Sequence, residues 1–153
     1  MAIVINGNGS ISGISVGGLN DGCVDSGTLV TDGTYSAINI KDYGVVTNDI
    51  GAIGGGAQTI DLELGNSISA TVDTSTTTFT FSNPTADDEL CAFALTLTNG
   101  GSQTVNFPAA VDWAGGSAPT LTTAGVDILV FATIDGGTIW HGQPFSLDSK
   151  TPS

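Results

Sequence analysis

Residues 76–142 set the architecture of this chain, and they read TTTFTFSNPTADDELCAFALTLTNGGSQTVNFPAAVDWAGGSAPTLTTAGVDILVFATIDGGTIWHG. Apolar residues alternate in this segment with Thr, Ser or Asp, and each alternating run ends at Gly or Pro. The segment holds no Lys and no Arg. Short alternating runs separated by turn residues predict an all-β protein whose body is a β-sandwich or jelly roll.

The alternation assigns an inward face to each expected strand. Ile60, Leu62 and Leu64 share one face, and the pair Gly65-Asn66 predicts a hairpin into the next strand. The inward residues of the later strands are Ile68, Ala70 and Val72, then Phe79 and Phe81, then Phe93, Leu95 and Leu97, then Val105 and Phe107. Residues 126–133 are more continuously apolar, which is typical of a central strand.

The Gly-rich residues 51–57 predict a turn or a linker. A phosphate-binding loop of this kind precedes a helix and carries a Lys, whereas here a strand pattern follows and no Lys is near.

We expect three parts: an extended N-terminal arm at residues 1–31, a body at residues 32–142 and an extended C-terminal tail at residues 143–153. Six apolar residues of the arm are spaced among Gly, Asn and Ser, and they are the candidate contacts with other copies or with a capsid: Ile3, Ile5, Ile11, Ile14, Val16 and Leu19. A lone two-stranded piece is marginally stable in water, so these residues need partners on the body or on another chain. The alternative is a flexible leader.

The charge balance limits the partners of this chain. The sequence contains fifteen Asp and Glu residues, and its basic residues are only Lys41 and Lys150, which gives a net charge of −13. Lys and Arg drive binding to phosphate backbones, so we expect neither nucleic-acid nor anionic-membrane binding. An acidic surface also keeps a protein displayed in many copies from clumping, although it can serve simple solubility as well.

The sequence shows no segment for export or membrane insertion. No apolar run approaches the roughly 20 residues that span a bilayer. The N-terminus lacks the basic start and long apolar stretch of a signal peptide. We therefore expect Cys23 and Cys91 to be reduced thiols, with Cys91 buried in an apolar strand.

No pattern for catalysis or for metal binding is present, so we expect no enzyme and no cofactor. His141 is the only histidine, and no Gly-x-Ser-x-Gly motif accompanies it. One His and two distant Cys do not make a zinc site. The acidic residues Asp87-Asp88-Glu89 are expected in a loop, where calcium is an alternative to plain solvation. The other strand-borne acids show no spacing that identifies a glycosidase pair: Asp61, Asp73, Asp112 and Asp127.

The two tryptophans are the candidates for surface recognition of sugars or of protein. Trp113 and Trp140 have large amphipathic rings that suit such contacts. The alternative for both is burial in the core, with each ring N–H bonded to a carbonyl.

Several segments resemble virion proteins of tailed bacteriophages, both tail-fibre proteins and small capsid decoration proteins. The residues that carry the resemblance are 76–84, 95–108, 111–122, 125–131 and 135–142, and residues 13–29 resemble fibre segments that precede a trimeric tip. The resemblance implies a homotrimer with a β-rich body. It also implies a place on the virion.

A chain of 153 residues without heptads or shaft repeats is short for a tail fibre. We therefore expect a self-contained decoration or cement protein on the outer capsid surface, assembled in the host cytoplasm, with the major capsid protein as its partner. The alternative is a short tail fibre or tip that binds a host-surface glycan.

Overall fold

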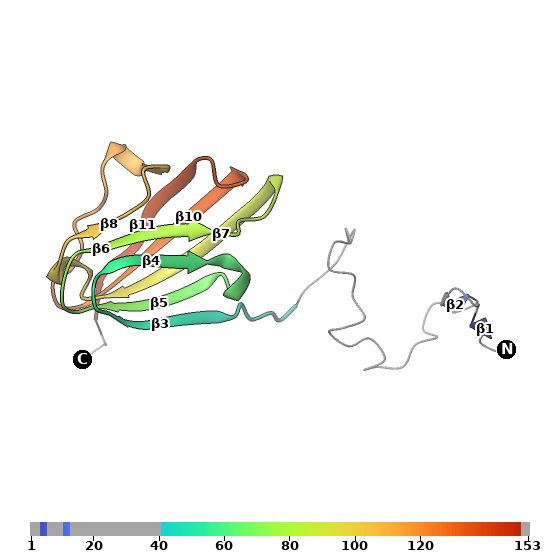
Figure 1. Cartoon of the computed structure of the whole chain (residues 1–153), viewed down its shortest axis with the longest axis horizontal. Helices are drawn as coiled ribbons and strands as arrows, with labels where there is room; N and C mark the ends of the chain where they lie inside the picture. The colour runs from blue at the N-terminus through green and yellow to red at the C-terminus, as the bar shows by residue number, and fades with distance from the viewer. Residues whose placement is uncertain (1–3, 6–10, 13–40, 151–153) are drawn as a thin grey trace. The chain divides into compact units, whose positions relative to one another are not determined.

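The computed structural model describes residues 4–5, 11–12 and 41–150 (Figure 1). The chain divides into two compact units, residues 1–42 and residues 43–153. In the first unit, β1 (Val4–Ile5) and β2 (Ile11–Ser12) pair antiparallel. The second unit contains all other described strands, and we call it the body. The division falls later in the chain than the predicted boundary at residue 32.

The body consists of two β-sheets that enclose one core (Figure 1). The larger sheet has the order β3-β5-β7-β10-β11-β9, with β3 (Thr47–Ile53), β5 (Ser67–Val72), β7 (Asp87–Thr98), β10 (Val126–Asp135), β11 (Trp140–Ser149) and β9 (Val111–Trp113). The smaller sheet has the order β4-β6-β8, with β4 (Gly56–Asp61), β6 (Thr77–Ser82) and β8 (Val105–Asn106). The described helices are short 3-10 turns, η1 (Leu62–Leu64), η2 (Gly100–Ser102) and η3 (Ala114–Gly116). The prediction of an all-β protein is confirmed.

The first six strands of the body follow a coiled path between the two sheets. Each strand of the larger sheet leads into a strand of the smaller one, from β3 to β4, from β5 to β6 and from β7 to β8. Within each sheet these strands pair in parallel, with Thr47 opposite Ser67 and Gly56 opposite Thr77. This path is that of a short β-solenoid, and it differs from a jelly roll, whose neighbouring strands are antiparallel.

The predicted hairpin at Gly65-Asn66 is wrong. β4 ends at Asp61, η1 follows, and β5 enters the other sheet beside β3. Gly65 is required at the crossing because a Cβ atom there would collide with the carbonyl of Val46. Leu64 therefore lies on the outside, 57% exposed, instead of sharing the inward face of Ile60.

Two predicted loops are also strands. The Gly-rich residues 51–57 contain the end of β3 and the start of β4, with a tight turn at Gly54-Gly55. The acidic residues Asp87-Asp88-Glu89 begin β7. Pairing with β5 holds residues 51–53, pairing with β6 holds residues 56–57, and Asp87 lies opposite Asp135 of β10. These pairings override the local preference of Gly and Asp for turns.

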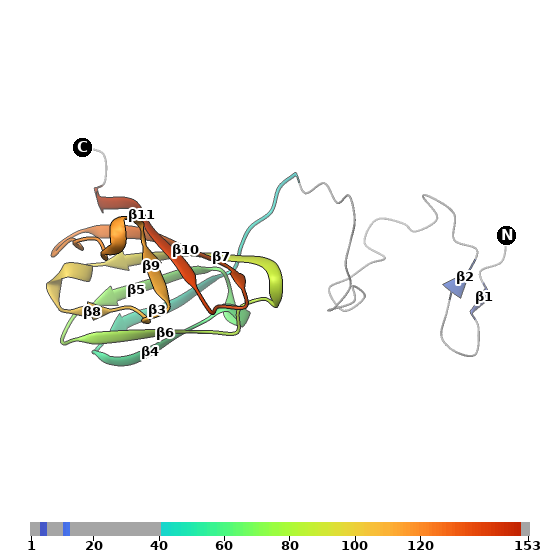
Figure 2. The ribbon, with the colours of Figure 1, turned by 90° about the horizontal axis from the view of Figure 1, so that it is seen from above.

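The C-terminal part of the larger sheet is antiparallel. β10 lies between β7 and β11 and pairs with both, which confirms the predicted central strand. Figure 2 shows β10 and β11 on the opposite side of the body from β4 and β6. β11 continues to Ser149, so most of the predicted tail at residues 143–153 is a strand of the sheet. Its apolar residues and its partner β10 extend the pairing past Gly142.

The core lies between the sheets and is rich in aromatic rings. Phe131 is fully buried, and its ring centroid lies 5.0 Å from that of Phe93 and 5.1 Å from that of Phe81. The predicted inward residues of β5 and β7 are buried, and Cys91 is buried as expected. Because side chains alternate along a strand, the period of two in the sequence identified these residues.

Thr77 has a buried hydroxyl that makes no hydrogen bond within the described part of the chain. Thr77→Val keeps the shape of the side chain and removes the unpaired oxygen. We expect it to raise the free energy of unfolding by about 1 kcal/mol, since a buried unsatisfied polar group costs about that much or more. Chemical denaturation of both proteins measures the change. A loss of stability would show that the hydroxyl has a partner, such as a bound water.

Candidate functional site

The two candidate tryptophans have different environments. Trp140 is 2% exposed, and its ring centroid lies 5.3 Å from that of Phe81 and 5.4 Å from that of Phe93. It is a core residue, so its proposed role in surface recognition is wrong. Trp113 is half-buried, with its ring centroid 5.0 Å from that of Phe107, and it also lines a surface pocket.

The pocket has a volume of about 310 Å³ and is formed by β9, β10 and β11. Apolar and polar groups both line it: Val130, Ala132, Ala114, Gly142 and Trp113, together with Asp112, His141 and Gln143. Such a mixture of an apolar surface with a few polar groups is typical of small-ligand sites.

Strand register brings these polar groups together. Ala132 lies opposite His141 across the β10–β11 pair, and His141 lies opposite Asp112 across the parallel β11–β9 pair. Gly142 is needed here because a Cβ atom would press against the ring of Trp113. No spacing in the sequence links Asp112 with His141, and only the pairing of β9 with β11 places them side by side.

Asp112, His141 and Gln143 can exchange hydrogen bonds with hydroxyl groups, and neither Ser nor Cys lines the pocket to act as a nucleophile. Within the described residues, no cluster of three or more His, Cys, Asp or Glu side chains could hold a metal ion.

The outer faces of the two sheets differ in character. On the smaller sheet, hydroxyl and amide groups bond across the strands, with 3.1 Å between the Oγ1 atoms of Thr59 and Thr80 and 3.3 Å from Asn106 Nδ2 to Thr78 Oγ1. On the larger sheet, the outward side chains of β10 and of residues 90–98 of β7 are apolar or are threonines, whereas β5 presents Ser67, Ser69 and Thr71 on the same side. The smaller sheet therefore has a hydroxyl-rich outer face, and the larger sheet has an apolar strip along β7 and β10 between polar strands.

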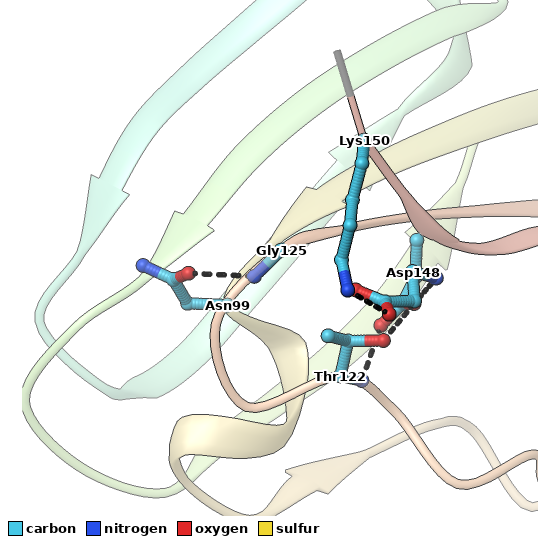
Figure 3. Close-up of polar contacts among 6 residues, drawn as sticks. Asn99, Thr122, Gly125, Asp148 and Lys150 are labelled. Carbon is cyan, nitrogen blue, oxygen red and sulfur yellow. Dashed lines mark hydrogen bonds and ion pairs between the residues drawn. The ribbon is translucent and has the colours of Figure 1, made fainter. Parts of the chain in front are cut away.

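A buried carboxylate holds three segments of the body together. Asp127 is fully buried and accepts hydrogen bonds from Thr122 N at 2.6 Å, Thr122 Oγ1 at 2.7 Å and Asp148 N at 3.0 Å. Figure 3 shows the neighbouring contacts, an ion pair of 2.7 Å between Lys150 and Asp148 and a hydrogen bond of 3.2 Å from Gly125 N to Asn99. This cluster is structural, because the hydrogen bonds that Asp127 accepts come from Thr122 and Asp148 of the same chain.

The other candidate acids also serve local structure. Asp61 caps η1 by accepting a hydrogen bond of 3.1 Å from Glu63 N, and it accepts another of 2.8 Å from Asn83. Asp73 accepts one from the hydroxyl of Thr74 at 2.9 Å.

Asp135 stabilises the turn between β10 and β11. Its carboxylate accepts hydrogen bonds from Ile139 N at 3.0 Å and from the Thr133 hydroxyl at 2.7 Å, and these bonds lower the pKa of Asp135 below the usual 3.8. A lowered folded-state pKa means that the stabilisation is present above the unfolded-state value and is lost as the pH falls through the folded one. We expect Asp135→Asn to be less stable than the wild type near pH 6, and the difference to shrink below pH 3.8. Thermal unfolding over this range measures it, and a difference independent of pH would contradict the assignment.

The candidate assembly residues of the arm are only partly described. Ile5 and Ile11 are opposite each other in the β1–β2 pair. Ile3, Ile14, Val16 and Leu19 lie outside the described residues.

Comparisons with known proteins return no relative: no family model, no curated protein and no solved structure matches this chain. In the part of the chain that the structure describes, no helix has the length and apolar character to cross a membrane.

Proposed function

We propose that this chain is a structural virion protein that decorates and stabilises the capsid of a tailed phage as a homotrimer. The observation that carries the proposal is the apolar strip on the outer side of β7 and β10, which gives the body a surface suited to protein contact. The resemblance of residues 76–142 to phage virion proteins supports the choice of partner, the major capsid protein on the outer capsid surface.

The proposed work is thermodynamic. A protein that binds only the expanded shell stabilises that shell by mass action. On a symmetric lattice, many weak contacts add through avidity, so a single copy does not need high affinity. The hydroxyl-rich outer face of β4, β6 and β8 suits contact with water.

Counting copies per particle tests this proposal. We expect quantitative mass spectrometry of purified virions to find hundreds of copies, in a fixed ratio to the major capsid protein. Particles assembled without this protein should release their DNA at a lower temperature than complete ones. A few dozen copies or fewer, or equal thermal stability of the two kinds of particle, would contradict a role in capsid decoration.

A short tail fibre or tip that binds a host-surface glycan is the second candidate, and the pocket beside Trp113 favours it. Sugars present both apolar C–H faces and hydroxyls, which match this lining. Glycan binding by the purified protein, weakened by Gln143→Ala and unchanged by Gln103→Ala outside the pocket, would support this candidate. An absence of binding to host cells and glycans would remove it.

A further inference from the structure

The outward residues of β10 and of the stretch 90–98 of β7 carry no charge, whereas Asp87, Asp88 and Glu89 at the start of β7 are exposed. Register places the outward residues in opposite pairs, Val126 with Thr98, Ile128 with Thr96, Val130 with Ala94 and Ala132 with Ala92. The alternation continues to Leu90 and Ile134, which are 72% and 63% exposed. We call these ten residues the β7–β10 face.

This pattern differs from that of a sheet with one solvent-exposed face. In such a sheet, inward apolar residues alternate with outward polar ones, whereas strands covered on both faces are apolar almost throughout. The inner positions of β10 are buried in the core, among them Leu129 and Phe131. Its outer positions are Val, Ile, Val, Ala and Ile, yet no described residue of this chain forms a third layer over them. The β7–β10 face therefore has the composition of a covered surface.

Charge indicates what covers it. The chain has a net charge of −13, so copies of it repel one another over most of their surfaces. Apart from the buried Asp127, the charged residues of these two strands lie at one end of the β7–β10 face, Asp87, Asp88 and Glu89 before Leu90 and Asp135 after Ile134, and none lies within the face. A basic partner would be attracted to the acidic surface elsewhere. A neutral apolar face is where two acidic copies approach at the lowest electrostatic cost.

We propose that the β7–β10 face packs against the same face of other copies of this chain, with the three faces around one axis. This inference rests on the proposed homotrimer and assigns its contact surface to the body. Ala92, Ala94 and Ala132 have small side chains, so that the sheets of neighbouring copies can approach one another closely. Leu90 and Ile134 project at one end, where they lose the most exposed area on assembly.

The proposed packing also covers the pocket beside Trp113, because Val130 and Ala132 belong to both surfaces. A ligand can therefore enter that pocket only when the β7–β10 face is uncovered. The variants described next distinguish these two states.

The test compares three matched variants of the full chain by sedimentation velocity. Leu90→Asp and Ile134→Asp each place a carboxylate on the β7–β10 face. Leu64→Asp places one on η1, where the leucine is 57% exposed and is not one of the ten residues of this face. We expect the wild type and Leu64→Asp to sediment at three times the chain mass of 15.3 kDa. We expect Leu90→Asp and Ile134→Asp to sediment as monomers at the same concentration, with an apparent dissociation constant raised at least about 100-fold, as for loss of a residue that contributes strongly to binding.

Folding is checked by circular dichroism of each variant. Ile134→Thr is a milder change that keeps a β-branched side chain, and we expect it to weaken association without changing the spectrum. The proposal is wrong if the wild type is a monomer at about 100 μM, which is above the range of most specific complexes. It is also wrong if the two face variants remain trimers, or if Leu64→Asp dissociates as readily as they do.

The two proposals fail separately. If Leu90→Asp dissociates the trimer but the trimer is absent from capsids, the β7–β10 face is supported as the contact surface and capsid decoration is contradicted. If the Leu90→Asp and Ile134→Asp variants remain trimers and still decorate capsids, the proposed function is supported and the proposed contact surface is contradicted.

Discussion

Phe131→Ala is expected to lower the free energy of unfolding by about 4 kcal/mol, the usual cost of truncating a buried aromatic side chain. Phe131 is fully buried, and four other aromatic rings surround it, with centroid distances of 5.0 to 5.7 Å. These rings come from both sheets, so the cavity cannot close by a movement of one strand. Denaturant unfolding at a fixed protomer concentration measures the loss.

Phe145→Ala is the matched control for this change. It removes the same atoms from β11 at a site where the side chain is 75% exposed. We expect a change within about 0.5 kcal/mol, as for most surface substitutions. Equal losses for the two variants would show that the aromatic cluster is not the centre of the core.

Asp127→Ala is expected to cost about 3 kcal/mol, since it leaves buried donors without an acceptor. The N–H groups of Thr122 and Asp148 both lose their partner, and the connection between β10, the end of β11 and the preceding loop is lost with them. A loss of this size lowers the melting temperature by about 10 °C in a domain of this length. Calorimetry of the variant provides the measurement.

Two further substitutions separate the hydrogen bonds from the charge. Asp127→Asn retains the Oδ1 acceptor, which serves the Thr122 hydroxyl and Asp148 N, and loses only the Oδ2 bond to Thr122 N. We therefore expect about half of the full loss. Asp73→Ala removes an exposed carboxylate whose one bond is to Thr74, and we expect almost no change. A stable Asp127→Ala protein would mean that water replaces the carboxylate.

The sequence predicted one residue of the candidate site but not its neighbours. Trp113 could be singled out because a large amphipathic ring suits a surface contact. Its pocket neighbours Asp112 and His141 could not be, because they meet only through the β9–β11 register. Trp140 has the same residue type and a similar local pattern, but the path of β11 places it in the core.

The sequence also predicted the β7–β10 face only in part. The continuous apolar run at residues 126–133 indicated a central strand, and β10 is central. The sequence alone did not reveal that its outer side lacks a covering layer, since this depends on where every other strand is placed.

Side-chain alternation is a local property, and so the all-β class and the inward residues of β5 and β7 follow from the order of amino acids alone. The partner of each strand is not local. Thr47 pairs with Ser67 and Ser67 with Ala94, and both pairings arise from a coil that passes through the second sheet in between. Packing of the two sheets around the aromatic core selects this path over the hairpin at Gly65-Asn66, because it buries Ile60 and Ile68 on the facing sides of different sheets. The coiled topology, the pocket beside Trp113 and the bonds of Asp127 are consequences of that packing.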